Sequence, residues 1–381
     1  MYPKYMPILK AKKGELDAIK SMLPYPHVMR DMLPIFEIPY LSKKQRTNKK
    51  YSNIGNPVEF FLNNTIKTLS ERMQNLPMGI DISRWPPNSS LETGEHILSH
   101  LTSALRNAGC NIIPVVGYDR WEDDEYATTL QQLGTSYTDF VIRLNSFAFE
   151  DMIEEEPFIE TIEGILTSLG AMPENCSVMI DLEDITKTSI VDLNETVQRA
   201  LDSLYKYNFK FISIAGSSIT SDINGMVPTH NSEGIVIRKE AKVWKAFKKF
   251  QPDLNLVFGD YGIVNPSIGD DIIAPDANGK IRYTIDDSLF VVRGYSRATG
   301  KKGAQMQDLC KILVSSSHYK GEKFSWGDKK IYECANEEFV GNTTNWVSID
   351  TTHHVTHIVA EVREFELILQ HQRDFQKQKQ K

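Results

Sequence analysis

Short apolar runs alternate with longer amphipathic segments over the first two thirds of the chain. The runs are rich in β-branched residues, as strands are, and the longer segments repeat their apolar positions with the period of a helix. This alternation predicts parallel strands that are covered by helices. The apolar runs lie at residues 6–9, 35–38, 79–82, 112–116, 140–144, 178–182, 211–215 and 256–258.

Two of the amphipathic segments carry clear helix boundaries. After the third apolar run, Ser89 or Ser90 is a candidate N-cap, and Gly109 ends a regular apolar stripe. After the sixth run, Asp192 is the candidate N-cap of an equally regular stripe. Comparable stripes occur after Gly14 and at residues 58–73, 158–169 and 243–250, so a helix is expected after most of the strands.

Eight strands with helices between them are the number that a (β/α)8 barrel needs. The span of residues 1–265 also matches the ~250 residues that such barrels occupy. The main alternative is an open doubly wound sheet, which the absence of a GxGxxG turn after an early strand disfavours. We therefore predict an α/β fold in which a TIM-like (β/α)8 barrel over residues 1–265 is followed by a C-terminal extension over residues 266–381.

Two parts of the chain depart from this pattern. A basic loop insertion at residues 41–57 is too polar to pack and is expected at the surface. Its charges are Lys43, Lys44, Arg46, Lys49 and Lys50. The extension is expected to contain an antiparallel hairpin from residues 281–284 and 290–295, a helix at residues 305–316, an irregular segment that includes SWGD and GNTTNWVSID, and a long terminal helix from about Thr352.

Composition and charge narrow the class of protein. With 381 residues and 41% hydrophobic positions, the chain can bury a large core. Its 43 basic against 50 acidic residues give a net charge of −7, which argues against a protein that coats nucleic acid. The four cysteines form no CxxC pair, so neither a disulfide framework nor a cysteine zinc site is expected. No signal peptide and no apolar stretch of about 20 residues occur, which predicts a cytoplasmic protein without membrane contact.

The polar residues at the carboxyl ends of the predicted strands are the candidates for chemistry, because barrel enzymes place their sites there. Asp181, Glu183 and Arg143 are the candidate catalytic residues, since alternation along the strand sends the two carboxylates to one face. The candidate ligand-binding residues are Lys10, Glu37, Asp81 and Asp260.

Three interpretations of this barrel mouth are open. Paired carboxylates can act as acid and base or nucleophile, as in glycosidases. They can also ligate Mg²⁺ while Lys10 and Arg143 hold a phosphate ester. Alternatively, the charges only neutralise one another at the rim of the barrel. The sequence assigns neither a cofactor nor a metal site.

The HHVTH motif places His353, His357 and Glu361 on one side of a helix, a spacing that can ligate zinc. The motif lacks the glutamate that follows the first histidine in HExxH metalloproteases. The favoured interpretation is therefore a polar helix start with Thr351 or Thr352 as N-cap. On the surface, the basic loop could contact phosphate and the acidic stretch at residues 150–156 could dock a basic partner; the net charge favours a protein partner over nucleic acid.

A set of motifs distributed over nearly the whole chain resembles one protein family. The motifs are YMPILKAKKGEL, LPIFEIPY, MGIDIS, DFVIRLN, VMIDLED, SWGD, GNTTNWVS and HHVTHIV. The chain is similar in these motifs to the beta protein family of P2-dependent satellite phages, which has relatives in bacterial genomes and prophages.

The resemblance implies a role in conflict between mobile elements. In the satellite phage, the beta protein is encoded beside a lethal partner called Gop and counteracts its killing, and the gene cluster is similar to an antiphage defence module. We therefore expect an antitoxin-like immunity or antiphage-defence component that neutralises or regulates a toxic protein partner, encoded nearby, by binding. The resemblance brings no catalytic residues with it. The alternative is a TIM-barrel enzyme that acts on a phosphate- or sugar-containing small molecule through the carboxylates at the barrel mouth.

Overall fold

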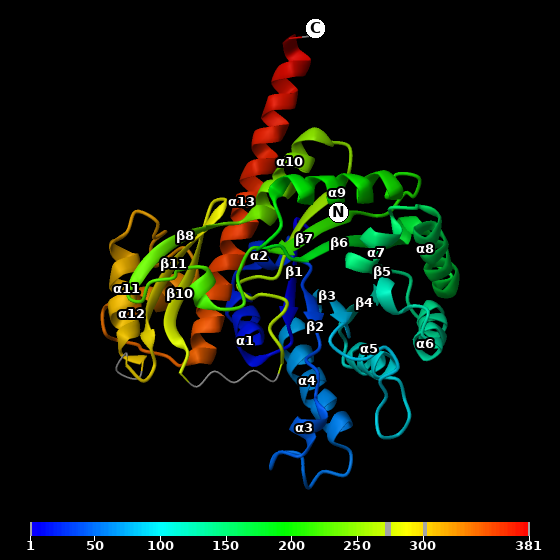
Figure 1. The fold of residues 1–381 in the computed structure, drawn as a ribbon, viewed down its shortest axis with the longest axis horizontal. Coiled ribbons are helices and arrows are strands. Elements are labelled where there is room, and N and C mark those ends of the chain that lie inside the picture. The colour runs from blue at the N-terminus through cyan, green and yellow to red at the C-terminus, as the bar shows by residue number, and fades with distance from the viewer. Residues whose placement is uncertain (1, 271–275, 300–302, 380–381) are drawn as a thin grey trace.

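The computed structural model describes residues 2–270, 276–299 and 303–379. Its centre is a closed barrel of eight parallel strands in the order β1-β2-β3-β4-β5-β6-β7-β9 (Figure 1). Pairing of β1 with β9, with Tyr5 opposite Phe258, closes the barrel. The barrel strands are β1 (Tyr5–Lys10), β2 (Ile35–Glu37), β3 (Pro77–Asp81), β4 (Asn111–Gly117), β5 (Phe140–Leu144), β6 (Cys176–Asp184), β7 (Ile212–Ser217) and β9 (Leu256–Asp260). Each contains most of one predicted apolar run, so the predicted TIM-like barrel is confirmed.

Helices surround the barrel because each buries one apolar stripe against it. They are α1 (Lys13–Met22), α2 (Pro26–Arg30), α4 (Pro57–Met73), α5 (Ile97–Asn107), α6 (Asp124–Gly134), α7 (Ser146–Asp151), α8 (Glu156–Leu169), α9 (Ile190–Leu204) and α10 (Lys239–Phe250). Two predicted N-caps were wrong. The side chain of His96, rather than Ser89 or Ser90, caps α5, and Ser189 caps α9 by accepting a hydrogen bond from the Asp192 amide.

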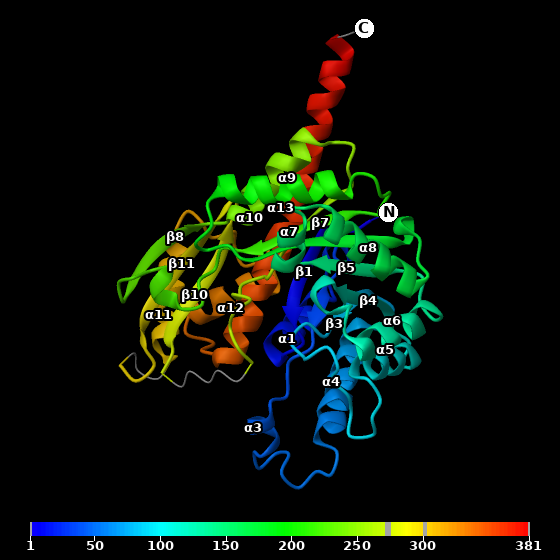
Figure 2. The same ribbon diagram turned by 45° about the vertical axis from the view of Figure 1, so that its right-hand side comes forward.

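The basic loop insertion contains a short helix, α3 (Lys43–Arg46), with Ser42 and Gln45 forming a reciprocal capping box at its start. The remainder of the insertion forms turns and leads into α4. Figures 1 and 2 show this part of the chain projecting from the barrel below α4. The basic side chains of the insertion are exposed or half-buried.

A three-stranded antiparallel sheet lies beside the barrel, in the order β10-β11-β8. The hairpin strands β10 (Asn278–Ile285) and β11 (Ser288–Ser296) come from the extension. The third strand, β8 (Ser232–Ile237), comes from the chain between β7 and β9, where the sequence analysis expected no strand. Two helices, α11 (Gln305–Ser315) and α12 (Trp326–Ala335), cover one face of β10 and β11.

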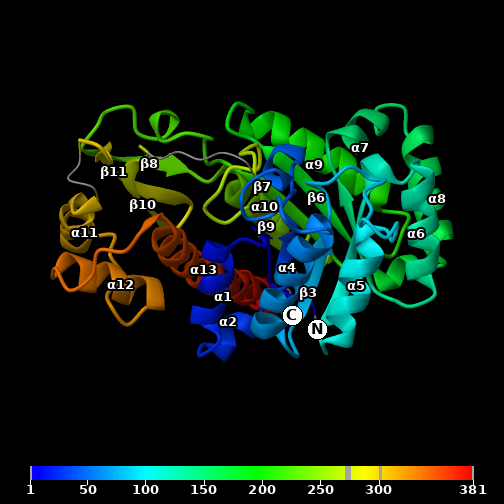
Figure 3. The same cartoon turned by 90° about the horizontal axis from the view of Figure 1, so that it is seen from below.

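The terminal helix α13 (Thr343–Lys379) connects the two parts of the molecule. Its first turns pack Trp346 and Ile349 into the core of the extension, and its middle packs Val355 and Ile358 into the core of the barrel. Figure 3 shows α13 between the three-stranded sheet and the barrel, and Figures 1 and 2 show its end projecting beyond both.

The helix α13 therefore begins nine residues before the expected Thr352, because its early apolar side chains are buried rather than exposed. The expected irregular segment is correspondingly shorter. Its SWGD motif is the start of α12, where the Ser325 hydroxyl accepts a hydrogen bond from the Asp328 amide.

Candidate functional site

The inside of the barrel has an apolar lower layer and a charged upper layer. Met6, Val141, Met179 and Val257 belong to the apolar cluster inside the barrel. The charged side chains lie nearer the carboxyl ends of the strands, at positions that also point into the barrel because side chains alternate along a strand. These are Lys10, Glu37, Asp81, Arg143 and Asp181, and all five are buried.

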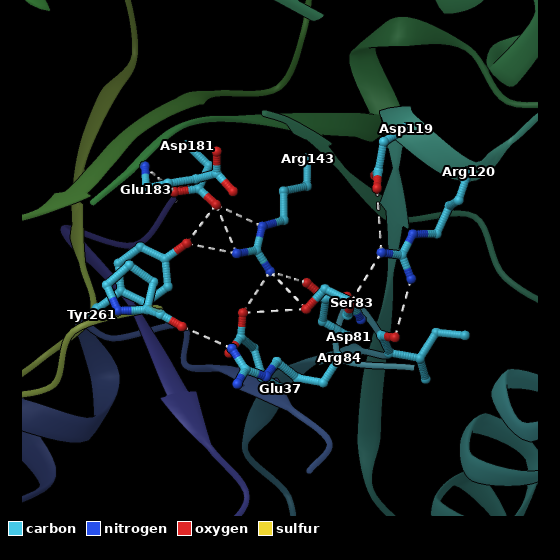
Figure 4. Close-up of polar contacts among 12 residues, drawn as sticks. Glu37, Asp81, Ser83, Arg84, Asp119, Arg120, Arg143, Asp181, Glu183 and Tyr261 are labelled. Atoms are coloured by element: carbon cyan, nitrogen blue, oxygen red, sulfur yellow. Dashed lines mark hydrogen bonds and ion pairs between the residues drawn. The ribbon is translucent and has the colours of Figure 1, made fainter. Parts of the chain in front are cut away.

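Arg143 is the centre of this charged layer (Figure 4). Its Nε donates to Asp181 Oδ2 at 2.8 Å, and its Nη1 donates to Glu37 Oε1 at 2.9 Å. The same Nη1 contacts Asp81 Oδ2, and Nη2 donates to the Tyr261 hydroxyl at 2.7 Å. One guanidinium thus joins three carboxylates from three different strands. We call these four residues and Tyr261 the Arg143 cluster.

Burial alone would lower the pKa of the Arg143 guanidinium, but Tyr261, Asp181, Asp81 and Glu37 together raise it well above its usual range. Arg143 is therefore charged at every accessible pH. Tyr261 donates its hydroxyl to Asp181 Oδ2 at 2.6 Å, and burial raises the pKa of this phenol well above 10. The cluster is a fixed network in which the carboxylates neutralise the cation.

In two of the carboxylates, the oxygen that does not contact Arg143 accepts a hydrogen bond from a backbone amide. Asp81 Oδ1 accepts the Ser83 amide at 2.7 Å, and Asp181 Oδ1 accepts the Glu183 amide at 3.0 Å. Glu37 Oε2 is the exception, since it has no hydrogen-bond donor among the described residues.

The segment 262–270, which we call the strap, lies over the barrel mouth. Arg84 donates to the carbonyl oxygens of Pro266 and Ile268 at 2.8 Å each, and Lys10 Nζ donates to the Ile268 carbonyl at 2.6 Å. The cavity between the strap and the cluster measures about 10 Å³, enough for about one water molecule. This cavity is too small to hold a sugar or a phosphate ester.

Glu15 on α1 lines the same small cavity, and burial raises the pKa of its carboxyl from 4.5 to about 7. Between these values the unfolded chain releases a proton that the folded protein retains, so the wild type loses stability as the pH rises from about 4.5 to about 7. Glu15→Gln is expected to remove this loss and to be more stable than the wild type by about 3 kcal/mol above pH 7. Urea unfolding at pH 4.5 and pH 8 measures the effect.

The matched control is Glu160→Gln, because Glu160 is exposed on α8. Its effect on the free energy of unfolding should be the same at both pH values. A Glu15→Gln effect that did not change with pH would contradict the buried, protonated carboxyl.

Glu183 lies beside the Arg143 cluster but does not contact Arg143. The strand β6 has an irregular register between Asp181 and Asp184, and Glu183 has a φ of 55°. This left-handed residue breaks the alternation that predicted a common face for Asp181 and Glu183. Burial and the neighbouring Asp181 raise the pKa of the Glu183 carboxyl, while Arg143 and Ser146 lower it less strongly.

Asp260 faces outward, away from the Arg143 cluster. It accepts a hydrogen bond from Tyr5 at 2.5 Å and one from His354 Nε2 at 2.9 Å. His354 Nδ1 lies 2.7 Å from Thr284 Oγ1, which gives the order of groups found in a hydroxyl–histidine–carboxylate triad. Thr284 is completely buried, however, so no substrate reaches it. These residues join the barrel, the hairpin and α13.

His353 and His357, the other two histidines considered for zinc or as a helix start, are also buried. His353 pairs with Asp328 and with the Thr284 carbonyl at 2.9 Å each, and the expected partner Glu361 pairs with Arg238 and Lys245 instead. Burial lowers the pKa of His357 to about 2. No group of three or more metal-binding side chains occurs in the described part of the chain. The favoured interpretation as a helix start was also wrong, because the motif lies in the buried middle of α13.

The structure thus unites four of the candidates, Glu37, Asp81, Arg143 and Asp181, in one cluster. Lys10 lies beside it at the end of β1 and contacts the strap, Glu183 borders it, and Asp260 belongs to a different network. Tyr261 and Asp270, a strap residue whose carboxylate accepts the Tyr40 amide and pairs with Arg84, were not among the predicted site residues. The inward alternation of Val257 and Tyr261 was a signal for the first, whereas the second depends on a turn that the sequence does not specify.

Comparison with known protein families gives a match over most of the chain. The model of a family described as Beta protein matches residues 5–360, which is nearly the whole chain. No curated protein matches the sequence. Within the described residues, no helix has the length and apolar character needed to cross a membrane.

Proposed function

The chain belongs to the beta protein family, and on this premise we propose that it is an antitoxin-like immunity or defence component that binds a toxic protein partner and neutralises or regulates it. The partner is expected to be encoded in a neighbouring gene. The proposal assigns the protein a binding function and gives the barrel a structural one.

The observation that carries this proposal is the content of the barrel mouth. A carboxylate acts as acid, base or nucleophile only where a substrate can reach it. Here Asp81 and Asp181 are paired with Arg143 through one oxygen and with backbone amides through the other. The strap closes the mouth above them, and the cavity is about the size of one water molecule. These features favour binding at another surface over catalysis at the mouth.

The outer edge of β8 is a surface that suits a protein partner. Among the described residues, β8 is the terminal strand of its sheet and pairs with β11 alone, so one side of it can accept a further strand. Ile235 and Ile237 point to the face on which α11 and α12 cover β10 and β11, but they remain 53% and 47% exposed. We place the partner at this β8 edge, where an extended segment can add a strand and bury both isoleucines.

Replacing both isoleucines, as Ile235→Glu with Ile237→Glu, is expected to abolish neutralisation while the protein stays folded. Two exposed charges oppose burial under a partner strand but cost the isolated protein little. The measurement is survival of cells that co-express the variant with the product of the neighbouring toxic gene. The melting temperature should fall by no more than a few degrees.

Val191→Glu is the matched control, because Val191 is 65% exposed on α9, a helix of the barrel and not of the three-stranded sheet. It should rescue the cells as the wild type does. Full rescue by the double isoleucine variant would exclude the β8 edge, and failure of the wild type to rescue would contradict the proposed function itself.

A further inference from the structure

A second cavity, of about 280 Å³, lies outside the barrel mouth between the start of α1, the basic loop insertion and α4. This volume is near the lower end of small-molecule sites in proteins. We call it the aromatic pocket. The residues that line it include Lys12, Lys13, Tyr40, Gln45, Phe61 and Asp270.

Its aromatic walls are held in place from behind by one buried tryptophan. The Tyr40 ring packs at a right angle to Trp85 with the centroids 5.0 Å apart, and the Phe61 ring lies 6.4 Å from Trp85. Trp85 itself donates its indole N–H to the Pro39 carbonyl. Tyr40 and Phe61 are only half-buried and both line the cavity. Rings that are fixed and partly open suit stacking of a planar ligand.

One end of the pocket is cationic. Lys12 and Lys13 line it at the N-terminus of α1, a ten-residue helix. Among the described residues no side chain caps this helix end, so its first amide groups lack a capping acceptor and its dipole favours an anion there. The basic loop adds Lys43, Lys44, Arg46, Lys49 and Lys50 nearby, and the chain contains no acidic residue between Glu37 and Glu59. This end is built for an anion.

A buried acceptor faces the same cavity. The Asp270 side chain is only 6% exposed, and its Oδ2 accepts the Tyr40 amide at 3.1 Å. Its Oδ1 lies 2.8 Å from Lys12 Nζ, so the two side chains form an ion pair at the wall of the cavity. An ionised carboxylate oxygen has two lone pairs, so Oδ1 can accept a further hydrogen bond from a ligand hydroxyl.

We propose that the aromatic pocket binds a nucleotide. The base stacks on Tyr40 and Phe61, a sugar hydroxyl donates to Asp270 Oδ1, and the phosphate lies at the N-terminus of α1 beside Lys12 and Lys13. The amide side chains of Gln45 and Asn48 line the pocket and can hydrogen-bond to the base edge. This inference uses residues outside the Arg143 cluster and the β8 edge, and it is independent of the proposed function.

Calorimetric titration of the full chain tests the proposal. The probes are the four common ribonucleoside 5′-monophosphates, adenosine, inorganic phosphate, and a single-stranded decanucleotide with a 5′-phosphate. We expect at least one monophosphate to bind at least tenfold more tightly than adenosine or inorganic phosphate. If the decanucleotide binds more tightly than the monophosphates, the natural ligand is the end of a nucleic acid. If it binds equally or more weakly, the natural ligand is a free nucleotide.

Three variants assign the site. Tyr40→Leu is expected to weaken nucleotide binding at least tenfold by removing the stacking ring, and Lys13→Gln about fivefold with a smaller salt dependence. Lys20→Gln, an exposed lysine at the other end of α1, should bind as the wild type does. The proposal is overturned if no nucleotide or oligonucleotide binds at millimolar concentration, if phosphate alone binds equally well, or if folded Tyr40→Leu and Lys13→Gln bind unchanged.

Discussion

Replacing Arg143 by methionine is expected to lower the free energy of unfolding by about 3–5 kcal/mol or more. Methionine fills a similar volume but leaves Glu37, Asp81 and Asp181 buried beside one another without their shared cation. Three unpaired carboxylates in one closed cavity must take up protons or expose themselves to water. Urea unfolding of Arg143→Met against the wild type at pH 7 measures the loss.

A second variant separates loss of the charge from loss of the arginine side chain. Arg143→Met combined with Asp181→Asn should be more stable than Arg143→Met alone, because one uncompensated charge has been removed. Arg30→Met serves as the control, since the Arg30 side chain is 73% exposed and should contribute less than about 0.5 kcal/mol. If Arg143→Met lowered the free energy of unfolding no more than the control does, the Arg143 cluster would not stabilise the barrel.

The second large effect is expected at the junction of barrel and extension. Asp260→Asn should lower the free energy of unfolding by about 3 kcal/mol, because Asp260 holds both Tyr5 and His354 in a fully buried network. Asp253→Asn, at an exposed position before β9, should change it little. A double-mutant cycle with His354→Ala should give a coupling energy of about 1–3 kcal/mol.

The contribution of the same pair to stability depends on pH. Although burial acts to raise the pKa of the Asp260 carboxyl, His354, Tyr5 and Arg238 lower it below its usual 3.8. Since the folded-state pKa is depressed, this contribution is present above about pH 4 and is lost as the pH falls below that value. The stability difference between wild type and Asp260→Asn should therefore shrink below pH 4. A difference independent of pH, or an absent coupling to His354, would contradict the ion pair.

The barrel could be predicted from the sequence because its strands are buried on both faces. Such strands appear as continuous apolar runs, for example residues 140–144 and 178–182, and each run became a barrel strand. The convergence of Arg143, Asp81 and Asp181 also followed, because parallel strands of a barrel end at one mouth. Here strand position alone determined which side chains meet.

The features that the sequence did not predict depend on contacts between distant segments. Asp260 lies two residues after Phe258 on β9, so both side chains point out of the barrel. Its partner His354 lies 94 residues later in the chain. The left-handed Glu183 interrupts a strand without a glycine or proline to mark it. The strand β8 contains a glycine and only a short apolar run, and its strand partner is β11. Tertiary contacts decided each of these cases.

The most direct test of the binding account is cell survival on co-expression with the toxic gene product, using Glu183→Gln and Asp181→Asn with Glu183→Gln. Glu183→Gln leaves the Arg143 cluster intact and should rescue fully. The double variant should rescue in proportion to the amount of folded protein, which its melting temperature and soluble yield report. A variant that is folded as fully as the wild type but does not rescue would contradict the account and would identify the barrel mouth as an active or ligand-binding site.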